Sequence, residues 1–167
     1  MRFIQLLGLS LLLSMNVFYI RPAKCQEVKV IKIDELISLL ENKEDTLMVI
    51  NFWATWCKPC VKELPCFYDI IREPKTSAVR VLLVSLDFKR NLHTTLIPFL
   101  KKRGTGPETW LLDETDYDSW INRIDKDWTG SIPATIFINN HKGIRKFHEG
   151  EFDCKSLNEE ISTLLNH

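Results

Sequence analysis

Stretches of apolar residues at two different spacings divide most of the chain into strands and helices. Nearly continuous apolar runs over 46–53 and 79–86 are typical of strands buried on both faces. Residues 57–72 between them have the spacing of a helix. A strand, a helix and a second strand in this order predict a right-handed parallel crossover.

The second half of the chain has a different order. Apolar runs over 134–139 and 144–149 flank a polar turn and predict an antiparallel hairpin. An amphipathic helix is expected over 155–165. The other expected elements are strands over 27–33 and 108–113 and helices over 35–41, 91–103 and 117–124, the first capped by Asp34. This order predicts one α/β domain with a central mixed sheet flanked by helices.

The first 25 residues are almost uncharged and stand apart from this pattern. Met1-Arg2 is followed by eighteen uncharged residues, 3–20, and then by Arg-Pro-Ala-Lys-Cys. Such a segment is typical of a secretory signal peptide, so we expect a signal over 1–25 and a mature domain over 26–167. The alternative is a membrane anchor through 3–20, since eighteen residues reach the lower limit of a spanning helix. Both alternatives place the domain in the periplasm or elsewhere outside the cytoplasm.

The balance of charged residues bears on the kind of partner, and the expected export bears on the cysteine chemistry. The chain has 22 basic and 22 acidic residues, and removal of residues 1–25 would leave 19 against 22, a formal charge of −3. A mildly acidic domain argues against a nucleic-acid partner. Outside the cytoplasm oxidation is the default state, so a reactive dithiol there needs a reductant or serves as an oxidant.

The candidate chemistry lies at 56–60, Trp-Cys-Lys-Pro-Cys, directly after the first buried strand. Zinc sites and redox sites both use this cysteine spacing, but the strand-to-helix position favours redox. No second pair completes a zinc site, so no metal is expected. A cysteine at a helix N-terminus is favoured as the thiolate. We expect Cys57 to be the nucleophile, Lys58 to support its thiolate, and Cys60 to resolve the mixed disulfide.

Within 26–167, the other candidates for chemistry are Glu63, two cysteines and four histidines. Glu63 has two interpretations: an acid–base group that takes the proton from Cys60, or a solvated helix residue. Cys66 and Cys154 are interpreted as two buried free thiols in preference to a second disulfide, because nothing in the sequence shows that they meet. The four histidines, His93, His141, His148 and His167, lie on expected surface segments and are assigned no role.

The predicted order of strands and helices, together with two motifs, resembles the thioredoxin superfamily. The motifs are Phe-Trp-Ala-Thr-Trp-Cys-Lys-Pro-Cys at 52–60 and Gly-Ser-Ile-Pro-Ala-Thr at 130–135. Within this superfamily the chain is similar to the exported TlpA/ResA-type thiol–disulfide oxidoreductases over 47–167. The resemblance implies a thioredoxin-like fold, a cis Ile132-Pro133 bond beside the dithiol, and an insertion over 104–128 before the cis-proline strand. The aromatic residues of that insertion are expected to pack on the sheet rather than to bind a partner.

The resemblance also implies roles for individual residues. Asn51 stands where cytosolic thioredoxins have a buried aspartate, and Glu63 matches a glutamate that influences cysteine acidity in ResA-like proteins. The residues expected to form a redox-active disulfide are Cys57 and Cys60, and those expected to dock a partner segment are Trp56, Lys58, Pro59, Ile132 and Pro133.

These features predict an exported enzyme that reduces disulfides of other exported proteins and needs no cofactor. The resemblance suggests apocytochrome c as a client and a membrane electron donor of the DsbD or CcdA kind. A DsbA-like oxidase is the nearest alternative, although its long helical insertion is absent. A peroxidase is disfavoured because its Thr-x-x-Cys motif is missing, and a binding module without turnover remains the third alternative.

Overall fold

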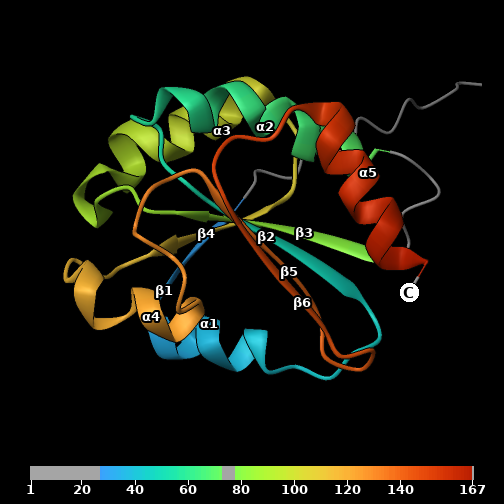
Figure 1. The fold of residues 1–167 in the computed structure, drawn as a ribbon. Helices are drawn as coiled ribbons and strands as arrows, with labels where there is room; N and C mark the ends of the chain where they lie inside the picture. Colours follow the sequence, from blue (N-terminus) through green and yellow to red (C-terminus); the bar gives the residue numbers. More distant parts are fainter. Residues whose placement is uncertain (1–26, 73–77, 167) are drawn as a thin grey trace, which may run out of the picture.

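The computed structural model describes residues 27–72 and 78–166, so the signal or anchor expected over 1–25 lies outside the described residues. Six strands form one mixed sheet in the order β1-β4-β3-β2-β5-β6 (Figure 1). The first four strands in this order run parallel to one another, whereas β5 runs antiparallel to both β2 and β6. The strands are β1 (Val28–Ile31), β2 (Leu47–Trp53), β3 (Val79–Ser85), β4 (Glu108–Leu112), β5 (Ala134–Asn139) and β6 (Ile144–Glu149).

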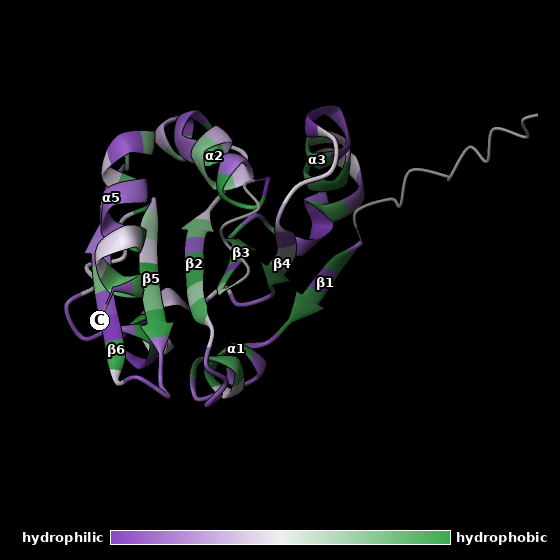
Figure 2. Ribbon diagram, turned by 90° about the vertical axis from the view of Figure 1, so that its right-hand side faces the viewer, coloured by the Kyte–Doolittle hydropathy of each residue, from purple (hydrophilic) through white to green (hydrophobic). Residues whose placement is uncertain are grey.

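Helices cover both faces of the sheet (Figure 1). On one face lie α2 (Lys58–Ile70), α3 (Ile97–Arg103) and α5 (Cys154–Leu165), and on the other α1 (Ile33–Leu40) and α4 (Ile121–Ile124). The short helical turns are η2 (Lys89–Asn91), η3 (Leu92–Leu96) and η4 (Tyr117–Ser119). Figure 2 shows that the inner strands are mainly apolar, whereas β6 and the helices include many polar residues. None of the helices within 27–72 and 78–166 has the length and apolar character needed to cross a bilayer.

Strand β2 carries the chain from the middle of the core to the start of α2. Every residue of β2 is buried, and β3 and β5 pair with it on either side. Its side chains alternate between the two faces: Ile50 and Phe52 pack with α1, whereas Val49 and Trp53 pack with α2. The end of β2 therefore delivers the cysteine motif to the carboxyl edge of the parallel strands, where α/β sheets commonly bind ligands.

The structure confirms the expected strands and corrects the expected helices in three places. The segment expected to be one helix over 117–124 is the 3₁₀ turn η4 followed by the four-residue helix α4. Asp34 does not cap α1, because the helix begins at Ile33 and the N-cap is Lys32, whose backbone N–H donates to the Glu35 carboxylate at 3.3 Å. The helix expected over 91–103 is a 3₁₀ turn, a π-helical turn and α3 in succession. Pro98, in the first turn of α3, has no backbone N–H to donate to the preceding turn, so one hydrogen bond of a continuous α-helix is missing there.

The expected insertion over 104–128 is partly a sheet element. Its strand β4 pairs with both β1 and β3, so this part of the segment belongs to the core of the fold. The remainder packs through aromatic rings: Trp120 and Trp128 are buried, with ring centroids 5.6 Å apart, and Trp128 also meets Phe52 at 4.7 Å. The expectation that these aromatics pack on the sheet is confirmed.

The interpretation of Cys66 and Cys154 as free thiols is wrong. The two residues form a disulfide with their Cα atoms 4.9 Å apart, which joins α2 to the first residue of α5. They are 88 positions apart in the sequence. Whether they meet depends on how α5 packs beside α2, and no local sequence pattern contains that information.

Candidate active site

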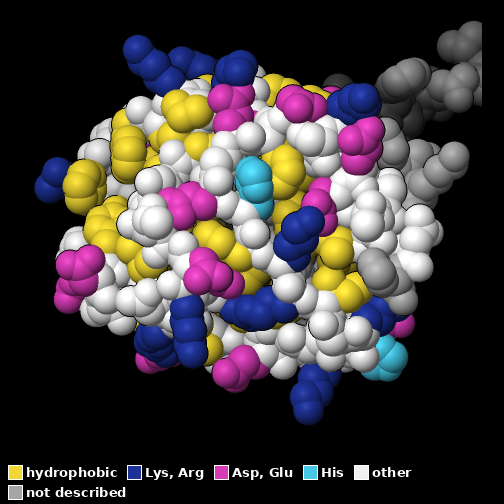
Figure 3. Space-filling model, in the orientation of Figure 1, with side chains coloured by type: hydrophobic (Ala, Val, Ile, Leu, Met, Phe, Trp, Pro, Cys, Tyr) yellow, Lys and Arg dark blue, Asp and Glu magenta, His cyan; other side chains and the backbone are white. Residues whose placement is uncertain are grey.

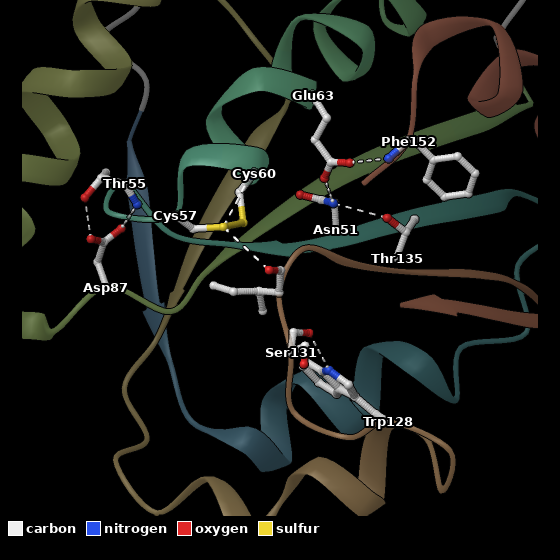
Figure 4. Close-up of a disulfide and its surroundings, with 11 residues drawn as sticks. Asn51, Thr55, Cys57, Cys60, Glu63, Asp87, Trp128, Ser131, Thr135 and Phe152 are labelled. Atoms are coloured by element: carbon white, nitrogen blue, oxygen red, sulfur yellow. Dashed lines mark hydrogen bonds between the residues drawn. A yellow bond between two sulfur atoms is a disulfide. The ribbon is translucent and has the colours of Figure 1, made fainter. Parts of the chain in front are cut away.

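Cys57 and Cys60 lie where β2 gives way to α2, and the structure joins them in a disulfide (Figure 4). Cys57 is the N-cap of α2, and its Sγ accepts the backbone N–H of Cys60 at 3.3 Å. Cys57 is 6% exposed and Cys60 fully buried, so Cys57 is the sulfur that solvent and partners reach. Pro59 fits the first turn of the helix because the N–H it lacks would have no helical partner.

A buried carboxylate holds the turn that precedes Cys57. Asp87 accepts the Thr55 backbone N–H at 3.0 Å and the Thr55 hydroxyl at 2.6 Å (Figure 4). The Ser85 hydroxyl, at the end of β3, donates to the same carboxylate at 2.8 Å. Sequence reasoning missed Asp87, although an acid directly after a buried strand was an available signal. This network ties the carboxyl end of β3 to the active-site turn.

The loop before β5 forms the opposite wall of the site. The Ile132-Pro133 peptide bond is cis, and the Ile132 carbonyl oxygen lies 3.6 Å from the Cys57 Sγ. The Trp128 indole donates to the Ser131 carbonyl at 2.9 Å. The Glu149 carboxylate accepts the backbone N–H of Ser131 at 2.9 Å and that of Thr129 at 3.0 Å.

Glu149 was also missed by the sequence reasoning. It ends β6, and its two oxygens hold both sides of the loop that carries the proline. Partial burial acts to raise the pKa of Glu149. The hydrogen bonds from Thr129 and Ser131 outweigh this effect and keep that pKa below its usual value. The loop is therefore anchored by a group that stays ionised at neutral pH.

Glu63 is buried beneath the dithiol on α2, with an exposed fraction of 1%. Its carboxylate accepts the Asn51 amide at 2.7 Å and the Phe152 backbone N–H at 2.8 Å (Figure 4). Burial raises the pKa of Glu63 to about 7, because the two hydrogen bonds offset only part of the desolvation of the charged form. The interpretation of Glu63 as a solvated helix residue is wrong.

Asn51 suits a partner that changes its protonation state. Its Nδ2 donates to Glu63 and, at 3.1 Å, to the Thr135 hydroxyl, while its Oδ1 has no hydrogen-bond partner. An amide can donate to a carboxylate through nitrogen and, turned over, accept from a carboxyl group through oxygen. Asn51 can therefore hold Glu63 in either form.

The residues expected to dock a partner surround Cys57 at different depths. Trp56 is 59% exposed, and Lys58 and Pro59 are exposed beside it. Ile132 is half-buried, whereas Pro133 is buried and supports the surface rather than forming its rim. Phe88, 45% exposed just after Asp87, is a further apolar residue that the sequence reasoning did not select.

The geometry is that of a dithiol site with a buried carboxyl group, Glu63, on the helix that carries Cys60. The described parts of the chain contain no group of three or more His, Cys, Asp and Glu residues that could hold a metal ion. Acidic and basic side chains are interspersed on the face shown in Figure 3. The chemistry that these residues support is therefore thiol–disulfide exchange at Cys57 and Cys60.

Comparisons with known proteins agree with this site. The model of the AhpC/TSA family matches residues 22–147. Thiol-disulfide oxidoreductase ResA of Oceanobacillus iheyensis is 39% identical over 56 residues, 34% of this chain and 29% of that relative. ResA of Halalkalibacterium halodurans is 30% identical over 126 residues, 75% of this chain and 66% of that relative. The alignments thus span less than two thirds of both curated relatives.

Among solved structures, the thioredoxin-related protein from Neisseria meningitidis serogroup B is similar with a TM-score of 0.63 and 24% identity. The similarity covers 77% of this chain and 91% of that one, and at this identity it shows the fold. The fold, the family match and the cysteine pair agree: the chain belongs to the AhpC/TSA family and is a TlpA/ResA-like member of the thioredoxin superfamily.

Proposed function

We propose that this protein works outside the cytoplasm and reduces disulfides of other exported proteins through Cys57 and Cys60. The observation that carries the proposal is the position of Cys57: its sulfur caps α2, faces the Ile132 carbonyl, and lies beside the exposed Trp56. A partner segment laid over Trp56 and Ile132 would present its disulfide to this sulfur.

The exchange proceeds in two displacements. The Cys57 thiolate attacks one sulfur of the client disulfide, forms a mixed disulfide and releases the other client sulfur as a thiolate. The Cys60 thiol loses its proton to Glu63 and attacks the Cys57 sulfur, which releases the second client thiol and leaves the Cys57–Cys60 disulfide. Two electrons pass to the client, and a reduced dithiol of a membrane electron donor restores the pair. A carboxyl group with a pKa near 7 is well matched to proton transfer at neutral pH.

The surroundings of Cys57 support reduction rather than oxidation of clients. A strong oxidant stabilises its nucleophilic thiolate, which favours the reduced form. Here the Cys57 sulfur receives the Cys60 backbone N–H but also faces the negative end of the Ile132 carbonyl. That carbonyl opposes the thiolate and so favours a more reducing dithiol. The apolar segment at 3–20 supports export, and fusion of residues 1–30 to a reporter enzyme that is active only after export tests it.

An insulin-reduction assay tests the activity, with dithiothreitol as the electron source. We expect Cys57→Ser to abolish turnover and Cys60→Ser to accumulate mixed disulfides, which also identifies clients in the host. Lys142→Ala, in the exposed turn between β5 and β6, is the matched control and keeps wild-type activity. Wild-type turnover by Cys57→Ser would exclude the proposal, and peroxide consumption without insulin reduction would assign a peroxidase instead.

A further inference from the structure

The second disulfide lies beside the buried acid of the active site. Cys66 follows Glu63 by three residues on α2, so the two side chains lie on neighbouring turns of one face. Cys154 follows Phe152 by two residues, and the Phe152 backbone N–H donates to Glu63. The disulfide therefore completes a closed path of bonds. The path runs from Glu63 along α2 to Cys66, across the two sulfurs to Cys154, and through residues 152–154 to the hydrogen bond on the Glu63 carboxylate.

We propose that the Cys66–Cys154 disulfide is a positioning device for the active site, which holds the Phe152 backbone N–H on Glu63 and keeps water away from the buried carboxyl group. This inference rests on the proposed role of Glu63 as the proton acceptor of Cys60. It gives a function to a cysteine pair to which the proposed exchange assigns no step.

The other contacts of this segment show why a covalent link matters. The Phe152 ring packs against Phe137 and stacks on His148 with centroids 5.9 and 4.1 Å apart. An ion pair at 2.5 Å joins Lys62 of α2 to Glu151, but Lys62 is largely exposed. Exposed ion pairs contribute little to stability. The disulfide is the covalent connection between α2 and the segment that covers Glu63.

The groups around Glu63 determine which way its pKa moves when residues 151–154, the covering segment, move away from it. In the covering segment, the charge of Glu151 acts to raise the pKa of Glu63. Lys62, next to Glu63 on α2, forms an ion pair with Glu151. His148 of β6 contacts the ring of Phe152. Asn51 and Thr135, on β2 and β5, are neutral. Burial is the largest influence on the pKa of Glu63, so entry of water lowers that pKa although the Phe152 hydrogen bond is lost.

The test is an NMR titration of the Asn51 side-chain amide and the Phe152 backbone N–H, with Cys57 and Cys60 oxidised. We expect an inflection near pH 7 in the wild type. In Cys66→Ala/Cys154→Ala it should move down by at least about one pH unit, a tenfold change in proton affinity. The pH profile of insulin reduction should move in the same direction. Leu164→Ala removes packing at the far end of α5 and serves as the control, with the inflection in its wild-type place.

An unchanged inflection in a folded double variant would overturn the inference. Should the alanine pair fail to fold, Cys66→Val/Cys154→Ala fills part of the lost sulfur volume and provides the same comparison. Glu63→Gln separates this inference from the proposed function. If Glu63→Gln leaves the pH profile of insulin reduction unaltered, the proton-acceptor role fails. If Glu63→Gln alters the profile but removal of the disulfide does not move the inflection, only the positioning role fails.

Discussion

Replacement of Glu63 by glutamine should remove a pH dependence from the stability of the fold. The pKa of this carboxyl group is raised from 4.5 to about 7, so the folded protein prefers the protonated form. A raised pKa contributes stability that is complete below the unfolded value and is lost as the pH rises through the folded value. The wild type should therefore become less stable between pH 4.5 and 7, whereas the neutral glutamine contributes no such change.

The size of the effect follows from the two pKa values. One pKa unit corresponds to about 1.4 kcal/mol, so full ionisation of Glu63 costs the folded state roughly 3 kcal/mol, of which about 2.5 kcal/mol falls between pH 5 and 8. Glutamine fits the site because its oxygen can accept the Phe152 N–H while its amide donates to the Oδ1 of a turned Asn51.

The assay is urea unfolding of the disulfide-intact protein at several pH values. The free energy of unfolding of the wild type should fall relative to that of Glu63→Gln by about 2.5 kcal/mol from pH 5 to pH 8. Glu159→Gln, an exposed position on α5, controls for the loss of a carboxylate and should follow the wild type. Parallel stability curves for the wild type and Glu63→Gln would refute the assignment of a raised pKa to this residue.

Three further changes probe other parts of the account. Cys66→Ala/Cys154→Ala opens a crosslink spanning 88 positions, and urea unfolding should show a loss of about 2–5 kcal/mol. Trp56→Ala should raise KM for insulin several-fold and leave turnover of a small disulfide such as oxidised glutathione unchanged, since this ring is 59% exposed. Glu149→Ala removes the acceptor of the Thr129 and Ser131 backbone N–H groups and should cost about 1–3 kcal/mol of stability and lower kcat/KM for insulin; unchanged kcat/KM would mean that the loop does not need this anchor.

Local patterns were sufficient to predict most of the fold. The unbroken apolar runs of β2 and β3 and the alternation of helix and strand predicted the sheet and its two halves, because these features depend on the spacing of apolar side chains. They could not predict that β4 enters the sheet between β1 and β3, since pairing among parallel strands is set by tertiary packing. The π-helical turn before Pro98 depends on how one missing N–H is accommodated, which periodicity does not register.

The active site also contains residues that a local pattern predicts and residues that depend on tertiary contacts. Cys57 and Cys60 were identifiable because their spacing and their position after a buried strand are properties of one short segment. The environment of Glu63 was not, because its hydrogen bonds come from the Phe152 backbone, 89 positions along the chain, and from Asn51 on β2. Asp87 and Glu149 were missed for a related reason: each acts by accepting backbone N–H groups of a distant loop.

The proposed function requires Cys57 and Cys60 to form a reducing dithiol. Equilibration of the protein with a graded series of thiol–disulfide buffers, followed by alkylation and peptide mass spectrometry, measures the reduction potential of this pair separately from that of Cys66 and Cys154. We expect the Cys57–Cys60 pair to titrate nearer to the thioredoxin value of about −270 mV than to the DsbA value of about −120 mV. A potential close to that of DsbA would contradict the account and assign an oxidase.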